Sequence, residues 1–194
     1  MTTANIEHFD SDELLALARL SLERNDVEGA LLKLKKIIDA GDPPADAIGL
    51  GARVYAQLGL YDRAGKLYER FLQAHPKAFL EQFQLGMTRF DAGRPDEAIK
   101  IWDEVLKDRP DYPPAVFYKA LALAQSERAA DAKLLLERLL KSVSVDNLYF
   151  GRSKELLQAI ESGASVQKST GKGQNGGTKS PVRGAPADPY RTEH

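Results

Sequence analysis

The stretch FQLGMTRFDAGRPDEAIKIW, residues 83–102, sets small residues at fixed distances from bulky apolar ones. Its second half opens an apolar stripe with the spacing of one helix face, made of Ala98, Ile101, Trp102, Val105 and Leu106. Pro95 fits the first turn of this helix, where its missing N–H is not needed, and Pro110 ends it. Gly86 and Ala98 are expected where two helices cross, because a bulkier side chain there would push the helices apart. The stretch therefore predicts a pair of closely packed helices.

The same pattern recurs every 34 residues along the chain. Two sets of positions hold only Ala or Gly, namely Ala18, Ala52, Gly86 and Ala120, and Ala30, Ala64, Ala98 and Ala132. Large apolar residues recur in parallel, as in the set Leu34, Tyr68, Trp102 and Leu136 and the set Ile37, Phe71, Val105 and Leu139. We therefore expect four units, each made of two amphipathic helices joined by a tight turn, over residues 11–44, 45–78, 79–112 and 113–146.

A further apolar stripe follows the fourth unit, in the stretch DNLYFGRSKELLQAI. Its members are Leu148, Tyr149, Leu156, Leu157 and Ile160. A lone helix after an array of helix pairs usually covers the exposed face of the last pair. We therefore predict a cap helix over residues 146–162 and a lead segment over residues 1–10, with nine helices and no strand.

Two units carry a recognisable set of residues. The third holds Leu85, Gly86, Phe90, Gly93, Ala98, Trp102 and Pro110, and the second holds Ala52, Tyr55, Gly59, Ala64, Tyr68, Phe71 and Pro76. This set at a 34-residue period resembles the tetratricopeptide repeat. The chain departs from the apolar positions of that family at Gln82, Arg89 and Lys119. The resemblance implies an all-α fold, a right-handed superhelical solenoid of antiparallel helix pairs within residues 11–162.

Residues 163–194 change in composition to Gly, Ser, Thr, Lys and Pro, and we predict that this tail is disordered. Its GKGQNG stretch matches the glycine pattern of a dinucleotide-binding turn but lacks the strand and helix that such a turn needs. The tail carries five Lys and Arg against two Asp and Glu, in a chain whose net charge is -1. One hypothesis is therefore that the SPVRGAPADPY segment folds back onto the body as a pseudo-ligand.

The composition and charge of the chain exclude several classes of function. The net charge of -1 gives no bulk reason to bind nucleic acid or a membrane surface, and the absence of cysteine excludes thiol chemistry. His8, His75 and His194 lack neighbours at the spacing of a metal site or a catalytic triad. The start MTTANIEHFDSDELL is not typical of a signal peptide, and no apolar run approaches the ~20 residues of a membrane span. We expect a cytoplasmic protein that is not an enzyme, without cofactor, metal, small-molecule substrate or membrane insertion.

The resemblance also implies a binding groove, because the first helix of each tetratricopeptide pair lines a concave surface. We place the groove-lining positions of the family's repeat on each unit of this sequence. The partner-binding residues that the resemblance then implies are Leu15, Arg19, Leu50, Arg53, Phe83, Met87, Phe90, Phe117, Tyr118 and Leu121. The first half of this groove is charged and the second half is apolar. An apolar half suits a partner that inserts Leu, Pro or aromatic side chains. Two arginines without asparagine partners do not match the clamp of co-chaperones that bind acidic C-termini.

Two alternatives stay open for these residues. Phe83, Met87, Phe90, Phe117 and Tyr118 also fit a core, because aromatic and Met residues at helical spacing usually pack inside, here partly under the cap helix or in a homodimer interface. The two arginines also fit ordinary pairing with nearby acids, for which the candidates are Asp12, Glu23 and Asp46.

The resulting hypothesis is an adaptor or chaperone that binds a protein segment in the concave groove, as a monomer or small homo-oligomer. Secretion chaperones of the tetratricopeptide class offer an analogy for the apolar half. The alternative is a structural assembly subunit whose apolar groove half is buried in a homo- or hetero-oligomer. Nucleic-acid binding rests only on the basic tail, which lacks interleaved aromatic residues.

Overall fold

The computed structural model describes residues 6–163, and within that range the chain forms nine α-helices and no strand. A short 3-10 helix, Ile6–His8, comes first. The helices are α1 (Ser11–Glu23), α2 (Val27–Asp39), α3 (Ala45–Gln57), α4 (Tyr61–Ala74), α5 (Phe79–Asp91), α6 (Pro95–Asp108), α7 (Pro113–Gln125), α8 (Ala129–Ser142) and α9 (Leu148–Glu161). None of these helices is long and apolar enough to cross a bilayer. The predicted tail lies outside the described residues from residue 164 onward.

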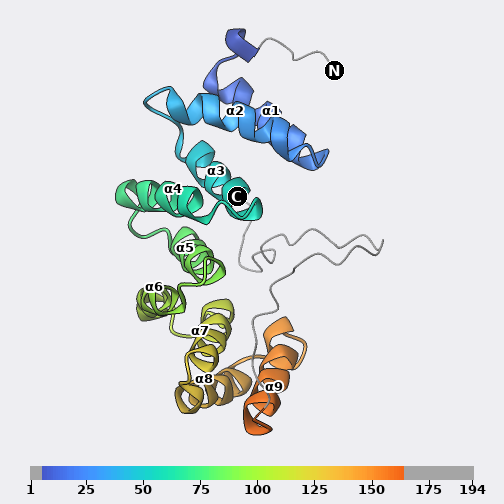
Figure 1. Ribbon diagram of the computed structural model, residues 1–194, viewed down its shortest axis with the longest axis vertical. Helices are drawn as coiled ribbons and strands as arrows, with labels where there is room; N and C mark the ends of the chain where they lie inside the picture. Colours follow the sequence, from blue (N-terminus) through green and yellow to red (C-terminus); the bar gives the residue numbers. More distant parts are fainter. Residues whose placement is uncertain (1–5, 164–194) are drawn as a thin grey trace.

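The helices stack as antiparallel pairs, which confirms the predicted all-α solenoid. Each odd-numbered helix from α1 to α7 packs most extensively on the helix that follows it, and each pair packs on the next. Figure 1 shows the pairs descending in a curved column, with α4 and α6 to the left of α3 and α5 and with α8 below α7. The last helix, α9, packs against both α8 and α7. The first helix of each pair (α1, α3, α5 and α7) is called an inner helix below.

Small residues stand at every crossing inside a pair. Ala18, Ala52, Ala98 and Ala120 have no exposed surface, and Gly86 shows why size matters. A Cβ at Gly86 would lie 2.3 Å from Nε1 of Trp102, so the indole ring occupies the space of the absent side chain. The Trp102 N–H also donates a hydrogen bond to the carbonyl oxygen of Phe83 at 3.3 Å. The side chain that fills the crossing therefore fixes both helices of the pair.

Two of the three polar residues at apolar family positions, Arg89 and Lys119, form ion pairs with neighbouring helices. Arg89 of α5 lies between Glu69 of α4 and Glu97 of α6, and its Nε is 3.3 Å from a carboxylate oxygen of Glu97. Gly65 makes room for it, because a Cβ there would lie 2.8 Å from the guanidinium. Lys119 of α7 pairs in the same way with Asp103 of α6. A charge so poorly exposed is retained only with its partner, so these pairs specify which helix faces meet.

The turn inside each pair uses the same backbone conformation in all four units. Positive φ angles occur at Asn25 (59°), Gly59 (73°), Gly93 (80°) and Glu127 (59°), each 34 residues after the last. Glycine adopts this left-handed region freely and asparagine tolerates it, whereas a longer side chain brings its Cβ close to the next carbonyl oxygen. The fourth unit, which lacks the turn glycine, therefore holds Glu127 in a strained conformation.

Replacing Glu127 with glycine tests this reading of the turn. We expect Glu127→Gly to raise the free energy of unfolding by about 1 kcal/mol, because glycine removes the Cβ clash. The matched change Gly93→Glu should lower it by a similar amount, since no atom lies within 4 Å of a Cβ built there and only the backbone conformation is at stake. Urea unfolding followed by circular dichroism measures both. A lower stability for Glu127→Gly would contradict the account.

Candidate partner-binding surface

One predicted position recurs on all four inner helices. It is occupied by Arg19 on α1, Arg53 on α3, Met87 on α5 and Leu121 on α7. Both arginines are exposed, whereas Met87 and Leu121 are half-buried and pack against the core of the C-terminal half. The row therefore changes from charged to apolar along the solenoid, as the sequence indicates.

The structure buries five of the ten predicted groove residues in the core. They are Leu15 (7 % exposed), Leu50 (9 %), Phe83 (2 %), Phe90 (5 %) and Phe117 (8 %). Each belongs to a cluster of buried apolar side chains, so the expectation that these five side chains line an open groove is corrected. The physical reason is that an inner helix is covered by a neighbouring pair as well as by its own partner helix. The alternative left open for Phe83, Phe90 and Phe117, a place in the core, describes their burial.

An aromatic cluster joins the inner helices of the C-terminal half. Tyr118 lies 6.1 Å from the ring of Phe83, 5.4 Å from that of Phe117 and 6.5 Å from that of Tyr149 on α9. Phe117 in turn lies 5.5 Å from Tyr149, which places it partly beneath the cap helix. Tyr118 remains half-buried, so the cluster reaches the surface through it.

Two aromatic residues that the sequence analysis missed extend this cluster to the edge of the solenoid. Tyr112 meets the rings of Phe79 and Phe83 edge to face, at 5.4 Å and 5.5 Å. Phe79 and Tyr112 are both half-buried. They are the first and last residues of the third unit, where the repeat pattern assigns loop, and their aromatic character was the signal available. We call the half-buried set Phe79, Met87, Tyr112, Tyr118 and Leu121 the apolar surface.

The charged half of the row is organised by one ion pair. A guanidinium nitrogen of Arg19 lies 2.6 Å from a carboxylate oxygen of Asp46 on α3, and both side chains are mostly exposed. This is one of the pairings that the sequence analysis left open for the arginines. Arg53 forms no salt bridge with a described residue. It lies within electrostatic reach of Tyr68, whose pKa burial raises above its usual value while Arg53 opposes that shift.

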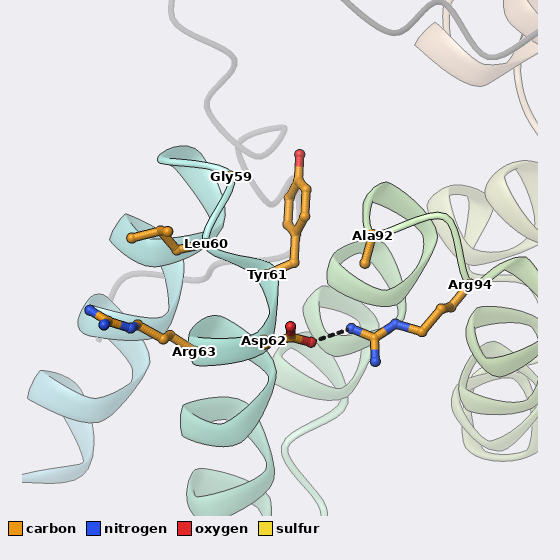
Figure 2. A pocket seen from close by; sticks show the side chains of 7 residues that line it. All are labelled: Gly59, Leu60, Tyr61, Asp62, Arg63, Ala92 and Arg94. Carbon is orange, nitrogen blue, oxygen red and sulfur yellow. Dashed lines mark hydrogen bonds and ion pairs between the residues drawn. The ribbon is translucent and has the colours of Figure 1, made fainter.

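A hollow of about 540 Å³ lies between the turns of the second and third units. Figure 2 shows Asp62 and Arg94 turned toward each other across it, 2.7 Å apart, while Arg63 points away on the other side of α4. A salt bridge between the second and third repeats therefore spans the hollow. No group of His, Asp or Glu side chains suited to a metal ion occurs among residues 6–163.

The comparisons with known proteins agree with this architecture. A family model described as tetratricopeptide repeat matches residues 15–79 and 83–146, which is more than half of the chain. Among solved structures, MamA AMB-1 is 26 % identical and superposes with a TM-score of 0.64, covering 74 % of this chain and 80 % of that chain. No curated protein matches the sequence.

Two more distant structures show the fold alone. A tetratricopeptide repeat protein from Parabacteroides merdae ATCC 43184 is 15 % identical, with a TM-score of 0.69 over 79 % of this chain and 60 % of that chain. MamA 41-end from Desulfovibrio magneticus RS-1 is 17 % identical, with a TM-score of 0.66 over 78 % of this chain and 89 % of that chain.

The different burial of Phe83 and Met87 predicts different costs of truncation. Phe83→Ala should lower the free energy of unfolding by about 3–5 kcal/mol, because it removes a ring from the core and leaves a cavity. Met87→Ala should cost about 1 kcal/mol, because its side chain is only half-buried. Urea unfolding of the two variants measures both values. Equal costs would show that the two side chains share one environment.

Proposed function

The chain belongs to the tetratricopeptide repeat family, a fold that supports protein–protein interaction, and we propose that it is an adaptor or chaperone that binds a segment of another protein. The proposal places the partner segment along the inner helices, in contact with the apolar surface. One observation carries it: half-buried aromatic and aliphatic side chains continue from α5 to α7 on one connected cluster. We further propose that the chain acts by binding and not by catalysis, and that it works in the cytoplasm.

The buried rings beneath the apolar surface support this role. Phe83 lies 6.3 Å from Trp102, and Phe90 lies 5.8 Å from the same ring, so the half-buried side chains rest on a tightly packed layer. A side chain that is already ordered loses little conformational entropy when a partner covers it. Aromatic residues with one apolar face and one hydroxyl are also frequent anchors of protein interfaces. The surface therefore suits a partner segment that contributes Leu, Pro or aromatic anchors.

The charged half suits orientation of the partner more than affinity. The Arg19–Asp46 pair is exposed at both ends, and such a pair contributes under ~1 kcal/mol. Complementary charges at the rim of an interface mainly affect association rate and register. We propose that Arg19 and Arg53 set the direction in which the segment lies along the inner helices.

A structural assembly subunit is the second candidate, and a separate observation favours it. Large apolar side chains are exposed near the C-terminal end, namely Leu134 (67 %), Val145 (73 %) and Leu148 (56 %). They lie on α8, in the loop that follows and at the start of α9. An assembly in which another subunit covers this end would bury them.

A pull-down from source lysate tests the proposed function. We expect wild type to capture a specific protein that the double variant Met87→Glu/Leu121→Glu fails to capture, because a carboxylate desolvated against an apolar segment is unfavourable. Leu32→Glu is the matched control, since Leu32 is 56 % exposed on the outer helix α2. Circular dichroism should show equal helicity for the three proteins. Capture of the same protein by the double variant would exclude the apolar surface as the binding site.

A further inference from the structure

Two kinds of contact distinguish many of the arginines among residues 6–163. One group pairs with carboxylates, and its members are Arg19, Arg89, Arg94, Arg128 and Arg138. The other group lies over aromatic rings instead and includes Arg109 and Arg152. The guanidinium carbon of Arg109 is 4.4 Å from the ring centre of Phe79, and that of Arg152 is 5.9 Å from the ring centre of Tyr149.

A guanidinium group that stacks on an aromatic ring can still donate hydrogen bonds from the N–H groups in its own plane. Arg109 and Arg152 are both exposed, and neither forms a salt bridge with another residue in the range 6–163. The acid nearest to Arg109 on its C-terminal side, Asp111, is already 2.9 Å from Arg138. Arginine carries five N–H donors and no acceptor, so each of these side chains presents donors to whatever covers it.

Contacts between rings connect the two arginines into one edge of the apolar surface. Arg109 covers Phe79, and Phe79 meets the ring of Tyr112 edge to face at 5.4 Å. Tyr112 also meets the ring of Phe83 at 5.5 Å. Phe83 lies 6.1 Å from Tyr118, which lies 6.5 Å from Tyr149, the residue that Arg152 covers. We call the set Phe79, Arg109, Tyr112, Tyr149 and Arg152 the basic edge.

One buried hydroxyl in the basic edge lacks a hydrogen-bond partner. Tyr149 is 5 % exposed, and its hydroxyl has no hydrogen-bond partner. Burial raises the pKa of Tyr149, which keeps that hydroxyl protonated and able to donate. A buried donor without an acceptor costs about 1–3 kcal/mol.

We propose that the basic edge binds an acidic side chain of the partner segment, next to an apolar anchor that rests on Phe79 and Tyr112. This inference rests on the proposed function and adds the class of the partner. The two guanidinium groups at this edge only donate, so an acceptor with negative charge complements them best. The rings of Phe79 and Tyr112, next to the arginines, provide the apolar surface on which the neighbouring anchor packs.

A peptide fits this edge better than a nucleic acid does. Arginine and aromatic rings together also bind single-stranded nucleic acid, but that mode needs a row of cations along the strand. Here only two stacked arginines are present, on a body whose acidic residues outnumber its basic ones within residues 1–162. The net repulsion for a polyanion therefore favours a short segment that carries a few carboxylates over a phosphate backbone.

Fluorescence anisotropy with two capped peptides tests the proposal on the full chain. The probes are the fluorescein-labelled peptides GAEEFLEEAG and GAQQFLQQAG, which share their apolar anchors and differ only in charge. We expect the acidic peptide to bind at least about tenfold more tightly at low salt, and this preference to disappear in Arg109→Gln/Arg152→Gln. Arg63→Gln is the matched control, because Arg63 lies 5.8 Å over the ring of Tyr55 on another part of the solenoid. It should keep the preference.

The other outcomes each overturn the proposal. Equal affinity for the two peptides would remove the acidic partner class while leaving apolar binding, and thus the proposed function, intact. Binding of neither peptide, or equal loss in Arg63→Gln, would show that the basic edge is not a site. A ten-nucleotide thymidine oligomer is the third probe. Tighter binding of this oligomer than of the acidic peptide would assign the edge to nucleic acid instead.

Discussion

The close crossing of two helices at a small residue is the constraint on which the rest of the structure depends. At Gly86 the indole of Trp102 fills the volume that any side chain would need. Ala18, Ala52 and Ala120 stand at the same place in the other pairs, without exposed surface. Helices held this close cannot rotate freely, because their ridges and grooves already interlock. The direction of every side chain on the inner helices follows from that contact.

The same packing produces the proposed binding surface. Phe83 and Phe90 pack around Trp102, and the half-buried side chains that face outward rest on this layer. The inner helices of the N-terminal half carry exposed Arg19 and Arg53 at the row where the C-terminal half carries apolar residues. One scaffold therefore presents a charged region and an apolar region along one line, which is an arrangement suited to an extended segment.

Periodicity was sufficient to predict the helix pairs, because crossings and turns recur at fixed positions, and the resemblance to the tetratricopeptide repeat implied the solenoid. The strained turn at Glu127 even follows from the register, since its position matches that of Gly93 one repeat earlier. The exposure of individual groove residues was not predictable in the same way. An offset within a repeat does not tell how far the neighbouring element covers it, as Phe117 beneath Tyr149 shows. The repeat pattern did not predict why a charged residue stands at position 89, because the carboxylates that pair with Arg89 lie on two other helices, α4 and α6.

Photo-crosslinking from position 121 tests the central claim most directly. A benzoylphenylalanine replaces Leu121 on the apolar surface, and in a second protein it replaces Leu32 on the outer helix α2. Both proteins are irradiated in the source cells. The account predicts a discrete protein adduct from position 121 and none of the same mass from position 32. An adduct that forms only from position 32 would contradict it, because the partner would then lie on the outer face of the solenoid.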